Sequence, residues 1–149
     1  MIYLRYSDIR YAPCYKTKYS AGADVKSAST VIFYPHETKV VGTGVFIDRE
    51  RTEKSLASSG SESLPYIEMT LRSSIGKRGL ILTNGIGIID ADYPGEIMLC
   101  LHHTNKDQIM LMNGERIAQL LLKYTSRFYG VEVDTSERTG GYGSTGGRG

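Results

Sequence analysis

Most of this chain consists of short apolar runs of strand length, separated by turn residues and rich in β-branched and aromatic side chains. The runs lie at 2–6, 31–34, 39–47, 66–71, 80–83, 86–89, 97–101 and 117–122, with 128–133 as a further candidate. Within one of them, Ile67, Met69 and Leu71 alternate with more polar residues, which predicts one face turned toward a core. Many short strands at close spacing predict an all-β sandwich or barrel, with at most one helical turn at 72–76.

Three segments between or beyond these runs have a different character. Pro94-Gly95 lies between two apolar runs and predicts a hairpin turn. Residues 48–63 are polar and predict a long, mobile surface loop inserted between strands. Residues 135–149 end in a glycine-rich stretch and predict a flexible C-terminal arm.

Length and composition narrow the class of protein. A chain of 149 residues, 40% apolar and 23% charged, fits a single globular domain that spans 1–149. The net charge of +2 is too small to favour a nucleic-acid partner. Cys14 and Cys100 are the only cysteines, which favours free thiols over a disulfide or zinc site. No run approaches the ~20 apolar residues that span a bilayer, so we expect no membrane partner and a cytoplasmic protein, in the host cytoplasm or nucleus if it is viral.

Three separate stretches carry side chains suited to binding a nucleotide. The triplet Arg72-Ser73-Ser74 offers a guanidinium and two hydroxyls, which bind phosphate oxygens. The turn 90–95 offers carboxylates that can activate water and an aromatic ring that can stack on a base or sugar. The stretch 140–146 combines glycines with an aromatic ring and hydroxyls. Each stretch alone has an ordinary explanation as a solvated cation, a turn or a loose terminus, but together they favour a nucleotide site.

Five motifs in order resemble those of the homotrimeric dUTPase family. They are Ala-Gly-Ala-Asp-Val-Lys-Ser-Ala (21–28), Arg-Ser-Ser-Ile-Gly-Lys-Arg-Gly (72–79), Asn-Gly-Ile-Gly-Ile-Ile-Asp-Ala-Asp-Tyr-Pro-Gly-Glu (84–96), Gly-Glu-Arg-Ile-Ala-Gln-Leu (114–120) and Arg-Thr-Gly-Gly-Tyr-Gly-Ser-Thr-Gly (138–146). The resemblance implies a jelly-roll-like β-barrel, a homotrimer whose sites each draw on three chains, and Mg²⁺-dependent hydrolysis of dUTP to dUMP and pyrophosphate.

The same resemblance implies a role for particular residues. Asp90 would deprotonate the water that attacks the α-phosphorus, and Asp24 would bind Mg²⁺ through water. Tyr93 would lie under the deoxyribose and exclude a 2′-hydroxyl. The remaining implied substrate contacts fall into three sets: the uracil pocket of Asn84, Ile88, Ile89 and Met98; the phosphate ligands Arg72, Ser73, Ser74 and Gln119; and the tail residues Arg138, Tyr142, Gly143, Ser144 and Thr145.

Two rival functions remain open at this level. A dCTP deaminase of the same fold shares the Arg-Ser-Ser triplet, but Cys100 stands where the deaminase motif would have its acid–base glutamate. A nucleotide-switched binding module is the second rival, and the presence of Asp90 argues against binding without chemistry. Release of pyrophosphate, tested with dUTP, dCTP, dTTP and UTP, distinguishes these functions.

Overall fold

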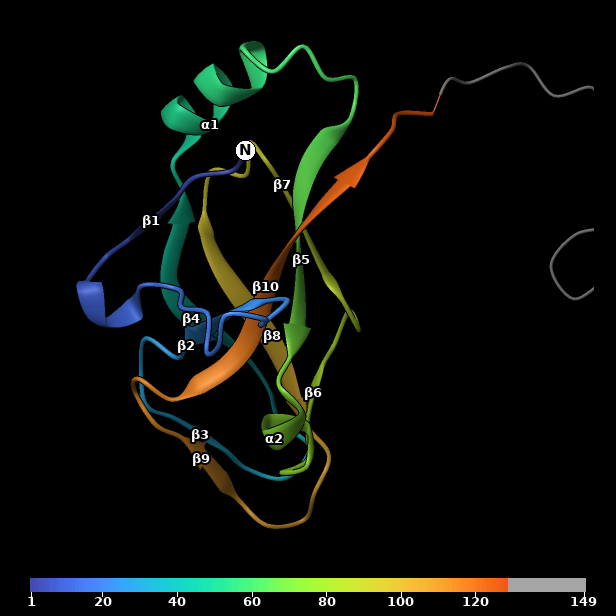
Figure 1. The fold of residues 1–149 in the computed structure, drawn as a ribbon. Coiled ribbons are helices and arrows are strands. Elements are labelled where there is room, and N and C mark those ends of the chain that lie inside the picture. The colour runs from blue at the N-terminus through green and yellow to red at the C-terminus, as the bar shows by residue number, and fades with distance from the viewer. Residues whose placement is uncertain (129–149) are drawn as a thin grey trace, which may run out of the picture.

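The computed structural model describes residues 1–128, and these form two four-stranded sheets that face each other across one core (Figure 1). The first sheet has the order β1 (Leu4–Tyr6), β4 (Thr38–Ile47), β8 (Glu96–His103), β6 (Leu80–Leu82), and the second has the order β2 (Ala23–Lys26), β10 (Arg116–Thr125), β5 (Leu64–Leu71), β7 (Gly87–Asp90). The other elements are the paired strands β3 (Val31–Phe33) and β9 (Ile109–Leu111), the 3-10 turn η1 (Ile9–Tyr11), and the helices α1 (Arg49–Ala57) and α2 (Ser73–Gly76).

Apolar side chains from both sheets fill the space between them. Val41, Leu99 and Leu101 from the first sheet and Val25 and Ile117 from the second are fully buried. The expected alternation in β5 is confirmed, because Ile67 and Met69 lie in this core while the residues between them are partly exposed. The antiparallel sandwich confirms the all-β, jelly-roll-like architecture.

The expected apolar runs from 2–6 to 117–122 all contain strands, and the single helical turn expected near 72–76 is α2. Two strands were missed. The missed strands are β2, whose four residues include two charged ones, and β9, which has three residues. They pair with β10 and β3, respectively. The candidate run 128–133 lies almost entirely outside the described residues.

The hairpin expected at Pro94-Gly95 is wrong. The turn joins β7 to β8, but β7 pairs with β5 in one sheet and β8 pairs with β4 and β6 in the other. The chain therefore crosses between the two sheets at this turn. Local turn chemistry correctly marked the change of direction, but it could not tell a hairpin from a crossover, because that depends on which distant strands are already paired.

The loop expected at 48–63 is wrong over residues 49–57, which form helix α1, while residues 58–63 belong to no helix or strand. Asp48 caps its start by accepting a hydrogen bond from the Arg51 backbone N–H at 3.2 Å. Ion pairs four residues apart, Arg49–Glu53 at 3.4 Å and Glu50–Lys54 at 2.6 Å, line its exposed surface. A cap and such pairs support a helix even where few apolar side chains are available for burial.

Strand register in the second sheet decides where the site residues lie. Across β2, β10 and β5, Asp24 is opposite Gln119 and Gln119 is opposite Thr70. Four residues further along β5, Tyr66 is opposite Asp90 of the edge strand β7. Because alternate residues of a strand share a face, Asp24, Gln119 and Asp90 all lie on the face of this sheet that points away from the core. Within residues 1–128, no helix is both long and apolar enough to cross a membrane.

Candidate active site

A buried carboxylate holds together side chains from two strands of the second sheet, β2 and β10, and from Arg72, the residue that follows β5. Asp24 on β2 is 1% exposed. Its Oδ2 accepts a hydrogen bond from Arg116 Nη1 at 3.0 Å, and its Oδ1 accepts one from Gln119 Nε2 at 3.1 Å. Arg72 Nε lies 3.4 Å from Oδ1. We call Asp24, Arg72, Arg116 and Gln119 the Asp24 cluster.

The Asp24 cluster has the chemistry of an anion site. A buried carboxylate is costly unless paired, and two guanidiniums and an amide provide that pairing here. Each guanidinium has five N–H donors and uses only some of them on Asp24, so the rest can face solvent from side chains that are 27% and 32% exposed for Arg72 and Arg116. Ser73 and Ser74 begin α2 directly after Arg72, and both are exposed. The structure thus brings the expected phosphate ligands together.

A second group of expected residues lies at the turn after β7. Asp90 ends that strand and is exposed, and its carbonyl oxygen accepts a hydrogen bond from the Tyr93 N–H at 3.1 Å, which closes the turn. The Tyr93 ring folds back over Gly95: a Cβ at position 95 would lie 3.0 Å from Tyr93 Oη. Both an acid and an aromatic ring therefore face outward at this turn.

The four residues expected to form a base pocket are divided between the two sheets. Ile88 is exposed on β7, Met98 is exposed on β8, and Asn84 is exposed in the turn before β7. The side chain of Ile89 is only 9% exposed and belongs to the core, so Ile89 can offer a ligand its backbone alone.

The two groups lie far apart within one chain. Asp90 is separated from Gln119 by two strand spacings across the sheet and four residues along it, which together amount to about 16 Å. Figure 1 agrees with this register, since the turn after β7 lies toward the α1 end of the molecule and α2, which follows Arg72, lies toward the other end. One copy of the chain does not bring Asp90 to an anion held by its own Asp24 cluster.

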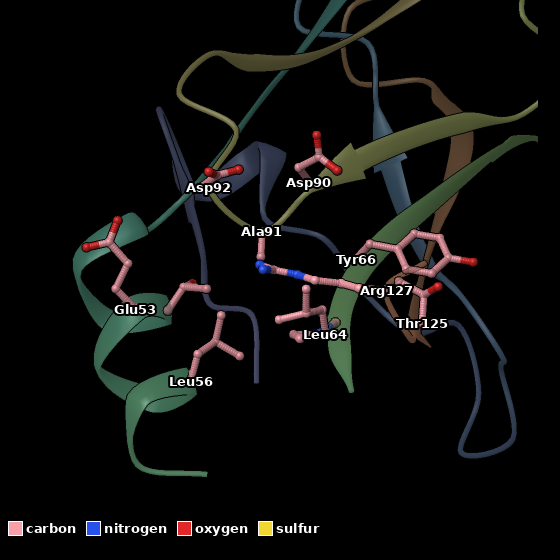
Figure 2. Close-up of a pocket in the computed structure, with 11 residues that line it drawn as sticks. Glu53, Leu56, Leu64, Tyr66, Asp90, Ala91, Asp92, Thr125 and Arg127 are labelled. Carbon is pink, nitrogen blue, oxygen red and sulfur yellow. The ribbon is translucent and has the colours of Figure 1, made fainter. Parts of the chain in front are cut away.

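A cavity of about 430 Å³ borders Asp90 on the side of α1. Figure 2 shows α1 on one side of it, the turn 90–92 above, and the ends of β5 and β10 on the other side. The lining residues are Thr52, Glu53, Leu56, Leu64, Pro65, Tyr66, Asp90, Ala91, Asp92, Thr125 and Arg127. The lining combines apolar side chains with three carboxylates and a guanidinium.

Sequence reasoning missed three of the charged residues at these places. Arg116 lies in the fourth motif but was not singled out, although an arginine on the strand beside a buried acid is the usual partner of such an acid. Glu53 and Arg127 reach the cavity only because α1 and the end of β10 lie on either side of it, which no local pattern reveals. The expected tail residues Arg138, Tyr142, Gly143, Ser144 and Thr145 lie outside the described residues.

Comparison with known proteins gives a consistent result. The model of the dUTPase family matches residues 10–146. The deoxyuridine 5′-triphosphate nucleotidohydrolase of Nautilia profundicola is 34% identical over 139 residues, which cover 90% of this chain and 89% of that protein. The crystal structure of dUTPase from Streptococcus mutans superposes with a TM-score of 0.69 at 25% identity and covers 87% of this chain and 98% of the other.

A phage structure shares the fold at lower identity. The dUTPase of phage phi11 of Staphylococcus aureus, solved with a structural Mg(II) ion, has a TM-score of 0.71 at 19% identity and covers 93% of this chain and 99% of its own. The family match spans most of the chain, and the Nautilia relative covers nearly all of it. The chain belongs to the dUTPase family, the enzymes that hydrolyse dUTP to dUMP and pyrophosphate.

Proposed function

We propose that dUTP binds between copies of this chain. The Asp24 cluster of one copy holds the phosphates, and Asp90 of another copy activates the water molecule that attacks. The observation that carries this proposal is the separation of about 16 Å between the two groups on one sheet. A general base acts within about 3 Å of the proton that it removes, so a second copy has to supply it. A closed homotrimer repeats one interface three times and so provides three such shared sites.

In the proposed reaction, Asp90 orients a water molecule and takes its proton as the oxygen attacks the α-phosphorus. The bond from the α-phosphorus to the bridging oxygen breaks, and pyrophosphate leaves with the electron pair. Arg72, Arg116 and Gln119 hold the phosphate oxygens with N–H donors, and Ser73 and Ser74 add hydroxyls. Donors that are already fixed by Asp24 need little rearrangement when charge develops on the phosphates.

We assign recognition of the base and sugar to β7, β8 and the turn 91–95 that joins them. The exposed edge of β7 offers the backbone of Ile88 and Ile89 to a uracil, and Asn84 and Met98 border the same space in this proposal. The Tyr93 ring lies under the deoxyribose, where it leaves no room for a 2′-hydroxyl. Arg138, Tyr142, Gly143, Ser144 and Thr145 complete the site from the tail of a further copy.

Members of this family use Mg²⁺, and the chemistry of Asp24 fits a contact through water. Arg116 and Gln119 each occupy one lone pair of the carboxylate, and Arg72 Nε lies 3.4 Å from Oδ1. An ionised carboxylate has about four lone pairs, so about one is left to accept a hydrogen bond from metal-bound water. Among residues 1–128, no three acidic, histidine or cysteine side chains gather as a metal cage. Bound Mg²⁺ would neutralise part of the triphosphate charge, and Asp24 would hold it through a hydrogen bond to its water shell.

Mixed assemblies test the shared site. Asp90→Asn lacks the base and Arg72→Ala lacks a phosphate ligand, so each variant alone is expected to be nearly inactive. When the two are unfolded together and refolded as a mixture, about a quarter of the sites regain one intact copy of each group if neighbours assort at random. Recovered release of pyrophosphate from dUTP supports a site between copies. If the mixture is no more active than the separate variants, both groups act within one chain.

A further inference from the structure

An ion pair outside the Asp24 cluster joins two of the segments that carry that cluster. Arg78 lies two residues beyond the end of α2, and its Nη1 donates a hydrogen bond to Glu115 Oε1 at 2.5 Å. Glu115 directly precedes Arg116, the first residue of β10. The side chains of Arg78 and Glu115 are 34% and 28% exposed, so solvent and salt screen their attraction only in part. Neither residue has a part in the reaction proposed above.

Both side chains also hold the backbone of the turn between β9 and β10. Arg78 Nη2 donates a second hydrogen bond to the carbonyl oxygen of Met110, the middle residue of β9. Glu115 Oε2 accepts a hydrogen bond from the Met112 N–H at 3.0 Å, and the Glu115 N–H donates to the Met112 carbonyl oxygen at 3.0 Å. Glu115 therefore closes this turn, and Arg78 is attached to the turn at two points.

The same turn is tied to the strand that carries Asp24. The Glu115 carbonyl oxygen accepts a hydrogen bond from the Ser27 N–H at 2.8 Å, and the Ser27 carbonyl oxygen accepts one from the Gly114 N–H at 2.8 Å. Ser27 is fully buried and directly follows β2. The turn therefore has a fixed place relative to Asp24, and Arg78 connects the segment after α2 to that place.

α2 is thus attached to the start of β10 from both of its ends. Before the helix, the Arg72 N–H donates to the Ile117 carbonyl oxygen at 3.0 Å. After the helix, Arg78 binds Glu115. A single helical turn with one such attachment can rotate about it, whereas two attachments fix the direction in which its side chains point. The two exposed serines that begin α2, at positions 73 and 74, lie between these attachments.

We propose that Arg78 and Glu115 are a positioning pair, which holds α2 in the orientation that lets its two serine hydroxyls bind the triphosphate of dUTP. This inference rests on the proposed role of Ser73 and Ser74 as phosphate ligands. A hydroxyl binds a phosphate oxygen over a narrow range of distance and angle, so a small rotation of α2 weakens that contact. Loss of the pair should therefore weaken the hold on the phosphates and leave the contacts to base and sugar intact.

Arg78→Ala in the full-length chain tests this proposal, with kcat and KM for dUTP as readouts. KM is expected to rise about fivefold to tenfold with kcat within about threefold of the parent, because a contact made equally in ground state and transition state affects KM alone. The inhibition constant of a non-hydrolysable dUTP analogue should rise by the same factor. The inhibition constant of deoxyuridine, which has no phosphate, should stay within about twofold.

Two single variants accompany Arg78→Ala. Arg78→Lys keeps the cation but not the planar fork of donors, so it should recover part of the lost affinity for dUTP. Lys77→Ala is the matched control and should leave KM unchanged. Lys77 is the neighbouring cation, its side chain is exposed, and within residues 1–128 that side chain forms no ion pair.

A double-mutant cycle separates a positioning pair from a direct ligand. Glu115→Ala breaks the same pair from its other side, so it should also raise KM for dUTP. The variant that carries both Arg78→Ala and Glu115→Ala should be no worse than the weaker-binding single variant, because the pair can be broken only once. If Glu115→Ala leaves KM unchanged, or if the two effects multiply, Arg78 acts without Glu115 and the proposal is wrong.

Fold and assembly are checked by circular dichroism and elution volume. Ile75 is buried and Thr104 Oγ1 donates to the Gly79 carbonyl oxygen at 2.9 Å, so the segment should stay folded without the pair. If Arg78→Ala misfolds, Arg78→Gln takes its place in the series. A lowered kcat with KM intact, or an equal loss of affinity for deoxyuridine, overturns the positioning role.

The role on which the proposal rests has its own test. Ser73→Ala and Ser74→Ala are expected to weaken binding of the non-hydrolysable dUTP analogue and to leave that of deoxyuridine unchanged. If both serine variants bind the analogue as tightly as the parent, the proposed phosphate ligands are wrong. That failure is distinct from one in which the serine variants lose affinity but Arg78→Ala does not, which contradicts the positioning pair alone.

Discussion

Tyr93 and Gly95 act as a unit at the turn after β7, because the tyrosine ring occupies the space beside residue 95. A Cβ at that position would lie 3.0 Å from Tyr93 Oη and 3.2 Å from Cζ, so a side chain there displaces the far end of the ring. If the ring excludes the 2′-hydroxyl, Gly95→Ala and Tyr93→Ala should both raise kcat/KM for UTP relative to dUTP. Gly76→Ala is the control, since a Cβ there meets nothing within 4 Å. An unchanged ratio in both variants means that sugar choice lies elsewhere.

Asp90 is expected to contribute to chemistry rather than to binding. Asp90→Asn keeps the size of the side chain and its place at the end of β7, but it cannot take a proton from water. We expect kcat to fall by about 10²–10⁴-fold, the usual contribution of a general base. The affinity for a non-hydrolysable dUTP analogue, measured by calorimetry, should change little. Turnover within a few-fold of the parent would contradict the assignment.

The motifs placed several distant residues in one expected site, and the structure brings some of them into contact. Asp24, Arg72 and Gln119 were expected together and are in contact, although they are up to 95 positions apart in the chain. Arg116 was missed because its importance comes from its distance to Asp24, which depends on the register of β2 against β10. Motifs indicate which side chains are candidates for a site, whereas the register of the strands decides which of these side chains lie in contact.

At the scale of elements, sequence located most strands but gave the wrong structure for 49–57. Composition suggested a loop because only Leu56 and Ala57 are apolar there. The helix forms for reasons that composition hides: the cap at Asp48, two ion pairs at a spacing of four, and a buried threonine that pairs with the N-terminal segment. The crossover at Pro94-Gly95 was missed for a related reason, since sheet membership is decided by distant strands.

Thr52 is expected to be the strongest anchor of α1. Thr52→Val keeps the shape of the side chain but removes the oxygen that accepts the Tyr3 N–H, so a partly buried donor loses its partner. Such a loss typically costs about 1–3 kcal/mol. We expect a clear fall in Tm by calorimetry, and no comparable fall for Arg51→Ala at the neighbouring exposed position. Equal Tm values for Thr52→Val and the parent would show that α1 is not anchored there.

At the scale of the whole molecule, residues 1–128 form a continuous core among themselves. Within this part of the chain, every residue of the main hydrophobic cluster precedes position 121. A chain that ends at Asp134 should therefore fold with nearly the parental Tm and assemble to the same elution volume, but it should hydrolyse dUTP poorly, because the proposed tail ligands are gone. Parental activity would show that residues 135–149 are not needed for turnover, and failure to fold would show that they stabilise the domain.

If the site is shared between copies as proposed, the distance between Asp90 and the Asp24 cluster makes the activity depend on how many copies of the chain are present. A single copy would then lack a complete site and would hydrolyse no dUTP until it assembles with others. Serial dilution should therefore lower the rate per copy once the concentration falls below that needed for assembly. In a cell that makes very little of this chain, most copies would be unassembled and each would contribute little activity. A modest rise in synthesis past the concentration needed for assembly would then raise the activity more than in proportion.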